Sequence, residues 1–182
     1  EKISKLIARF AIPSIVSMVV NSLYNIVDQI FIGQGVGYLG NAATNVAFPL
    51  VTICFAFALL VGDGCAAYLS LKLGAGESAA KGVANAIVML GILGIFFFVM
   101  SFALMIPLLN LFGATENVLP YAIEYTQIII IGLPFVIMST GLNSAIRADG
   151  SPKLAMISML SGAILNTILD PIFILVFHWG VA

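Results

Sequence analysis

Long apolar stretches, separated by short polar segments, fill most of this chain. Five of them are long enough to cross about 30 Å of hydrocarbon, which takes about 20 helical residues. They extend over residues 10–32, 46–71, 83–109, 120–146 and 154–178. None alternates with the period of two of a barrel strand, and a backbone in lipid must be satisfied within helices or closed barrels. The pattern predicts an all-α integral membrane protein with five transmembrane helices.

Composition supports this fold class. The 182 residues are 62% hydrophobic and only 8% charged, against about 25% charged in a typical soluble domain. We expect a multi-pass protein of the cell membrane, with the lipid bilayer as a partner. No basic patch is present, so no nucleic acid is expected. Cys54 and Cys65 stand about three helical turns apart, too far for a disulfide, and are predicted to be packing residues.

The basic residues predict the orientation. All seven lie before the first apolar stretch, between the second and third, or between the fourth and fifth: Lys2, Lys5, Arg9, Lys72, Lys81, Arg147 and Lys153. The connections 33–41 and 110–119 contain none. Because positive residues mark the cytoplasmic side, the N-terminus is predicted to be cytoplasmic.

The first apolar stretch carries a narrow polar stripe. At 100° per residue, its polar members fall within about 80° of one another: Ser14, Ser17, Asn21, Asn25 and Asp28. A carboxylate inside a membrane helix costs roughly 2.5–3.5 kcal/mol on insertion scales and is rarely there without a function. The stripe is therefore expected to face protein or a water-filled cavity.

A second candidate site lies in the fifth stretch. Asn166 and Asp170 are one helical turn apart on the same face. Pro171 has no N–H, so the carbonyl of Thr167 loses its helical partner and stays available. Carboxylate, amide and free carbonyl oxygen suit a proton or a small cation such as Na⁺, and the residues leave both ions open.

The predicted depths of the acidic residues in the membrane show which of them could share a site. Asp28 and Asp170 are both predicted in the outer half of the membrane, and they could share one site if their helices are neighbours. Asp63 is predicted in the inner half, and Glu124 near the outer interface. The favoured interpretation of these last two is an interhelical hydrogen bond or an interfacial group.

The positions of two helix ends are also predicted. Ser151-Pro152 is typical of a helix start, and Gly74-Ala75-Gly76 of a tight helix stop. The segment from Gly35 to Gly40 fits G-x-G-x-x-G, but it follows a membrane helix rather than a strand. It is therefore interpreted as a flexible loop rather than a dinucleotide site.

The order of several motifs resembles one transporter family. They are Ile12-Pro13-Ser14-Ile15, Leu23-Tyr24-Asn25-Ile26-Val27-Asp28, Phe31-Ile32-Gly33, Ser70-Leu71-Lys72-Leu73-Gly74-Ala75-Gly76, Arg147-Ala148-Asp149-Gly150-Ser151-Pro152-Lys153 and the segment from Asn166 to Pro171. As a set they resemble the N-terminal lobe of the multidrug and toxic compound extrusion (MATE) family. The resemblance covers nearly the whole chain.

The resemblance implies a fold and an activity. A MATE transporter has twelve helices in two lobes and exchanges H⁺ or Na⁺ for lipophilic, often cationic, compounds. Residues 1–182 would then be an incomplete N-terminal lobe, without helix six and the second lobe, which would be its partner in the same chain. Asp28, Asn166 and Asp170 match the cation-linked site, and Asn143 is a plausible neighbour by position. No cofactor beyond the coupling ion is implied.

Cavity-lining or substrate-contacting roles are assigned to five polar or helix-bending positions: Asn21, Asn25, Asn143, Thr167 and Pro171. The leading hypothesis is a cation-coupled antiporter that exports drugs and toxins, not an enzyme. A flippase for lipid-linked oligosaccharides is an alternative, but its cavity would need cationic residues within the spans. An intramembrane aspartyl protease is a remote alternative, because Asp28 follows Val27 rather than Tyr and Asp63 lacks the first glycine of Gly-x-Gly-Asp.

Overall fold

The computed structural model describes residues 3–35 and 37–172, and every regular element in them is a helix. The order is α1 (Ile3–Gly35), α2 (Tyr38–Gly74), α3 (Ala80–Ala103), α4 (Met105–Leu111), α5 (Leu119–Ala148) and α6 (Pro152–Pro171). All except the short α4 are long and apolar enough to cross a membrane. The all-α fold with five spans is therefore confirmed.

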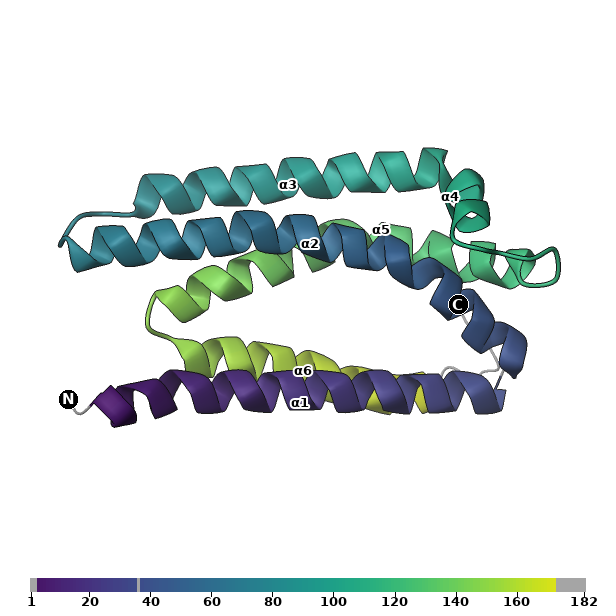
Figure 1. Cartoon of the computed structure of the whole chain (residues 1–182), viewed down its shortest axis with the longest axis horizontal. Helices are drawn as coiled ribbons and strands as arrows, with labels where there is room; N and C mark the ends of the chain where they lie inside the picture. Colours follow the sequence, from purple (N-terminus) through teal and green to yellow (C-terminus); the bar gives the residue numbers. More distant parts are fainter. Residues whose placement is uncertain (1–2, 36, 173–182) are drawn as a thin grey trace.

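The helices form two groups (Figure 1). Helices α2, α3 and α5 pack on one another, with α4 against α5, and we call this group the three-helix body. Helices α1 and α6 lie along each other and form the two-helix pair. The pair joins the body through contacts of α6 with α5 and a smaller contact of α1 with α2.

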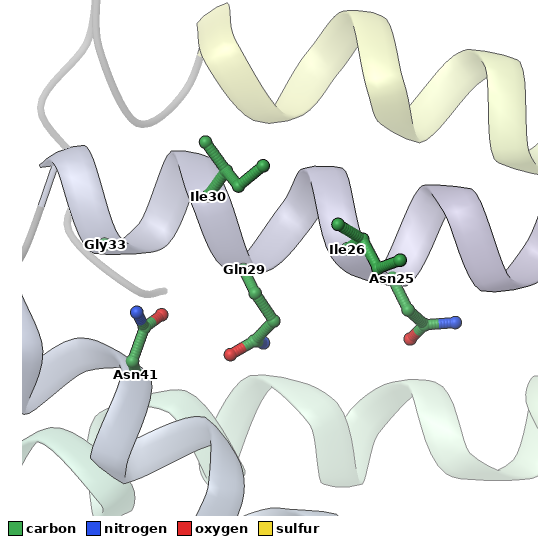
Figure 2. Close-up of a pocket in the computed structure, with 6 residues that line it drawn as sticks. All are labelled: Asn25, Ile26, Gln29, Ile30, Gly33 and Asn41. Carbon is green, nitrogen blue, oxygen red and sulfur yellow. The ribbon is translucent and has the colours of Figure 1, made fainter.

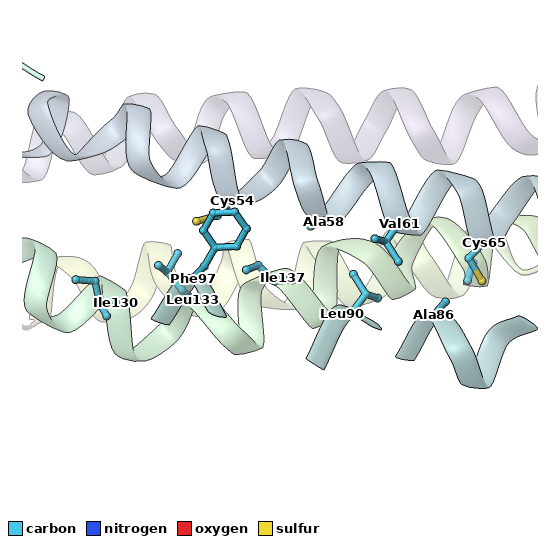
Figure 3. Packing of buried hydrophobic residues seen from close by; sticks show 11 residues of the cluster. Cys54, Ala58, Val61, Cys65, Ala86, Leu90, Phe97, Ile130, Leu133 and Ile137 are labelled. Carbon is cyan, nitrogen blue, oxygen red and sulfur yellow. The ribbon is translucent and has the colours of Figure 1, made fainter. Parts of the chain in front are cut away.

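The core lies inside the three-helix body. Figure 3 shows Cys54 of α2 close to Phe97 of α3 and Leu133 of α5, within one continuous buried cluster. Small residues bring the backbones together: a Cβ on Gly62 would lie 2.6 Å from the carbonyl oxygen of Gly141. Cys54 and Cys65 are both free and buried, so their predicted role as packing residues is confirmed.

The connection between α1 and α2 is shorter than predicted. Helix α1 continues to Gly35 and α2 begins at Tyr38, eight residues before the predicted Val46. The prediction of a flexible loop from Gly35 to Gly40 was wrong, since Gly40 lies in the first turn of α2. The extra turns are stabilised by burial, because Ala43 packs in a second buried cluster with residues before and in α5. Gly37, at φ 80°, supplies the sharp change of direction.

The predicted helix 83–109 is broken into two. Helix α3 ends at Ala103, Leu104 leaves the helical conformation with ψ 17°, and α4 starts at Met105. Pro107 favours the break, because its ring would clash with the carbonyl of Ala103 in a regular helix. The proline alone does not decide it, since Pro13, Pro49 and Pro134 lie inside continuous helices. In the first turn of α4, Pro107 is tolerated, since no N–H is needed there.

The predicted positions of two helix ends are confirmed. Helix α2 stops at Gly74, and Gly76 has φ 72°, as the tight stop requires. Helix α6 starts after Ser151 with Pro152 in its first turn, although the Ser151 side chain makes no capping hydrogen bond.

Candidate functional site

The two-helix pair places the helices that carry the predicted coupling residues side by side. Helix α6 packs along α1, which confirms the condition that the two helices are neighbours. Asn166 Nδ2 donates to the hydroxyl of Tyr24, at 3.2 Å. Tyr24 lies one helical turn before Asp28, so Asn166 faces α1 one turn from that carboxylate. The backbone of Asp170 continues α6 one turn beyond Asn166, and its side chain lies outside the described residues.

The polar stripe of α1 is satisfied within its own helix. Ser17 Oγ donates to the Pro13 carbonyl at 2.8 Å, and Asn25 Nδ2 to the Asn21 carbonyl at 2.7 Å. Ser17 is buried, whereas Asn21 and Asn25 are exposed. These bonds do not tie α1 to another helix. Asn21 and Asn25 are therefore left free to contact water, a ligand or further protein, as their predicted cavity-lining role requires.

The proline at the end of α6 keeps the predicted carbonyl available. Pro171 is the last residue of α6, so the carbonyl of Thr167 meets no N–H one turn on. The Thr167 hydroxyl donates to the carbonyl of Ala163 at 2.8 Å, and its side chain is exposed. The Pro171 side chain lies outside the described residues. The Thr167 carbonyl oxygen thus remains a candidate ligand.

An open cavity of about 580 Å³ lies between α1 and α2. Figure 2 shows its lining residues: Asn25, Ile26, Gln29, Ile30, Gly33 and Asn41. Gln29 Nε2 donates to Thr44 Oγ1 at 3.3 Å and so joins the two helices. The sequence interpretation missed Gln29 and Asn41. Gln29 adjoins Asp28 and could have been added to the stripe, whereas Asn41 was hidden in a segment interpreted as a loop.

Asn143 joins the body to the pair rather than lying beside Asn166. It is buried, its Nδ2 donates to the carbonyl of Ala155 at 3.2 Å, and its Oδ1 accepts from Arg147 Nη2 at 2.7 Å. Ala155 is eleven residues before Asn166 on α6, a rise of about 16 Å. The structure thus places Asn143 at the α5–α6 junction, and its contribution to a cavity stays a prediction.

The two remaining membrane carboxylates are exposed. Asp63 on α2 and Glu124 on α5 make no hydrogen bond or ion pair with the described part of the chain. The interhelical hydrogen bond favoured for them is therefore absent there. Within the same residues, no three or more His, Cys, Asp or Glu side chains gather into a site for a metal ion.

Comparison with known proteins agrees with this architecture. The family model described as MatE matches residues 13–172. The chain therefore belongs to the MatE family, and with its five apolar spans it is a multi-pass protein of the cell membrane.

Its relatives are export proteins about two and a half times as long. The multidrug export protein MepA of Staphylococcus haemolyticus (strain JCSC1435) is 29% identical over 187 residues, covering 100% of this chain and 40% of MepA. A structure of the MATE multidrug transporter DinF-BH matches with a TM-score of 0.94 and 37% identity, over 99% of this chain and 41% of that one. A MATE in complex with MaD3S matches with a TM-score of 0.89 and 30% identity, over 96% and 40%. The chain thus spans about 40% of the length of the relatives it matches.

Proposed function

We propose that the complete protein containing this chain is an antiporter, which exports lipophilic or cationic compounds across the cell membrane in exchange for H⁺ or Na⁺. Membership of the MatE family and the relatives named as multidrug export proteins support the export. The observation that supports the coupling is the contact between α1 and α6 at Asn166 and Tyr24, one turn from Asp28.

The coupling follows from the cost of charge in this environment. Asp28 is only partly exposed, so its carboxylate has lost part of its hydration, and a bound proton or Na⁺ offsets that cost. Binding of the ion at Asp28, Asn166 and Asp170 then stabilises one arrangement of α1 and α6. Export is linked to it because the compound and the ion compete for the same negative charge or favour different arrangements.

The described residues favour this proposal over its rivals. A flippase cavity would need cationic residues to hold an anionic pyrophosphate, yet Arg147 near the C-terminal end of α5 is hydrogen-bonded to Asn143.

A protease dyad would need two adjacent carboxylates. Asp28 lies about 10 Å from the end of α1, whereas Asp63 lies about 37 Å into α2, so the two are well over 20 Å apart along these helices.

Ethidium efflux from everted vesicles tests the proposal. Vesicles would contain the complete protein, and H⁺ and Na⁺ gradients would be imposed separately. We expect gradient-driven efflux by the wild type and none by Asp170→Asn or Asp28→Asn at the same membrane level. Glu124→Gln, which removes an exposed carboxylate elsewhere, should behave as the wild type. Gradient-driven efflux retained in Asp170→Asn would exclude the proposed coupling site.

A further inference from the structure

Helix α2 carries a polar stripe of its own. At 100° per residue, four polar residues of α2 fall within about 20° of one another: Asn45, Thr52, Asp63 and Ser70. All four are exposed. The residues of α2 that pack into the body, such as Cys54, lie on the opposite face of the helix. The stripe therefore faces away from the three-helix body.

Close backbone contact fixes this orientation at the level of Asp63. Because a Cβ on Gly62 would lie 2.6 Å from the carbonyl oxygen of Gly141, the backbones of α2 and α5 touch there. Asp63 follows at 100° around the helix, so it is held away from α5. On its other side, a Cβ on Gly64 would meet nothing within 4 Å. The carboxylate thus has open space around it.

Asp63 differs from its neighbours on the stripe in needing an outside partner. Asn45 and Thr52 satisfy their donors within the helix, on the carbonyls of Asn41 and Phe48. A carboxylate has only acceptors, and the backbone N–H groups around it are already used by the helix. Asp63 has no partner in residues 3–35 and 37–172. The most apolar window of α2 has a mean hydropathy of 2.1, so this carboxylate is expected to meet water, a cation or further protein rather than lipid.

The surroundings of Asp63 suit a lipophilic cation. Leu59 and Leu60 on the preceding turn are 41% and 70% exposed, and Ala67 on the following turn is small. A single negative charge beside an apolar wall and free space complements a flat organic cation, which can bury its rings and keep its charge paired. Asp63 lies about 16 Å from the end of α2 at Gly74, and the predicted orientation puts that end at the cytoplasm.

We propose that Asp63 determines specificity by binding the cationic group of the exported compound, at a point on α2 separate from the coupling residues of the two-helix pair. The inference rests on the proposed function and assigns the inner half of the α2 stripe to the export path. The inference requires that Asp63 distinguishes charged from uncharged compounds. It also requires that a change of Asp63 does not alter the binding of the coupling ion.

Binding of matched dyes to the purified complete protein, without a gradient, tests the inference. Ethidium is a cation, and its reduced form dihydroethidium is uncharged with the same ring system. Asp63→Asn is expected to weaken ethidium binding at least tenfold and to leave dihydroethidium binding unchanged. Asp63→Glu should restore most of the ethidium affinity. Glu124→Gln should change neither dye.

A second variant keeps the test decisive if Asp63→Asn does not yield folded protein. Ala67→Lys places an ammonium one turn from Asp63 on the exposed face, where it should displace ethidium but not dihydroethidium. Equal losses for both dyes, or unchanged ethidium binding, would overturn the inference. A separate efflux measurement distinguishes the two proposals. If the wild type binds ethidium through Asp63 but shows no gradient-driven efflux, only the proposed antiporter function is contradicted.

Discussion

The three-helix body and the two-helix pair are both built from apolar helices, but they bury very different shares of their residues. In the most apolar 18-residue window of each helix, 33% of the residues are buried in α2 and 39% in α5, against 11% in both α1 and α6. The windows of the body are also the more apolar, with a mean hydropathy of 1.8–2.6 against 1.4–1.6 in the pair. The body has a packed core within the described chain, whereas the pair leaves most of its surface for lipid, a cavity or further protein.

This difference divides the described chain into a tightly packed region and a loosely packed one. The body is fixed by close backbone contacts such as Gly62 with Gly141 and Gly94 with Pro134. The pair contains the candidate coupling residues, and its polar groups bond locally or through single contacts, such as Asn166 with Tyr24 and Gln29 with Thr44. Regions that change arrangement during function are expected to be the less tightly packed ones. The four predictions below test this division, from the largest expected effect to the smallest.

Gly62→Ala should loosen the body. Its Cβ would lie 2.6 Å from the carbonyl oxygen of Gly141 and 2.7 Å from its Cα, so α2 and α5 must move apart. Such overpacking costs about 1–3 kcal/mol, and a clear drop in the thermal unfolding temperature of the detergent-solubilised complete protein is expected. Gly64→Ala, two residues further on, meets open space and should unfold as the wild type does. If both changes shift the unfolding temperature equally, the backbones of α2 and α5 do not touch at Gly62.

Asn143→Leu should weaken the link between the two regions. It removes the hydrogen bond to Ala155 and leaves the side chain of Arg147 without its acceptor. Leaving buried polar groups unpaired costs about 1–3 kcal/mol. Faster hydrogen exchange at the start of α6 is expected, without a change in α3. The matched control is Asn45→Leu, since Asn45 is exposed and bonds only within its own helix; exchange in α6 that stays slow in Asn143→Leu would contradict the assigned role.

Thr126→Val should tighten the body. Thr126 is fully buried in α5, and its Oγ1 has no hydrogen-bond partner in the described part of the chain. Replacing an unsatisfied buried hydroxyl by a methyl group of similar size is expected to stabilise by about 1 kcal/mol, measured as a raised unfolding temperature. Thr52→Val, at an exposed hydroxyl that bonds the Phe48 carbonyl, should give no such gain. A destabilised Thr126→Val would mean that the hydroxyl has a partner.

Tyr24→Phe should affect only the pair, and weakly. Interhelical hydrogen bonds between membrane helices average about 0.6 kcal/mol. A double-mutant cycle of Tyr24→Phe with Asn166→Leu, measured by unfolding, is expected to give a coupling energy of about that size. The same cycle of Tyr24→Phe with Thr52→Val, in the body, should give none. Strictly additive effects of the first two changes would exclude the contact between α1 and α6 at this level.

The sequence by itself determined the number of spans, the polar stripe of α1 and the family. These follow from rules that act within one helix: apolar length sets the spans, and the period of 3.6 residues places polar side chains on one face. The break before α4 was not determined in this way, because Pro107 disfavours a continuous helix but Pro13, Pro49 and Pro134 lie inside unbroken ones.

Only the tertiary structure decided which faces meet. It extended α2 through the burial of Ala43, paired α6 with α1, and gave Asn143 its partner on α6. Gly62 and Gly64 show the reason. Both flank Asp63 in the same helix, yet one touches the backbone of α5 and the other faces open space. Local patterns contain no information on that difference, because it depends on the position of a helix almost eighty residues away in the sequence.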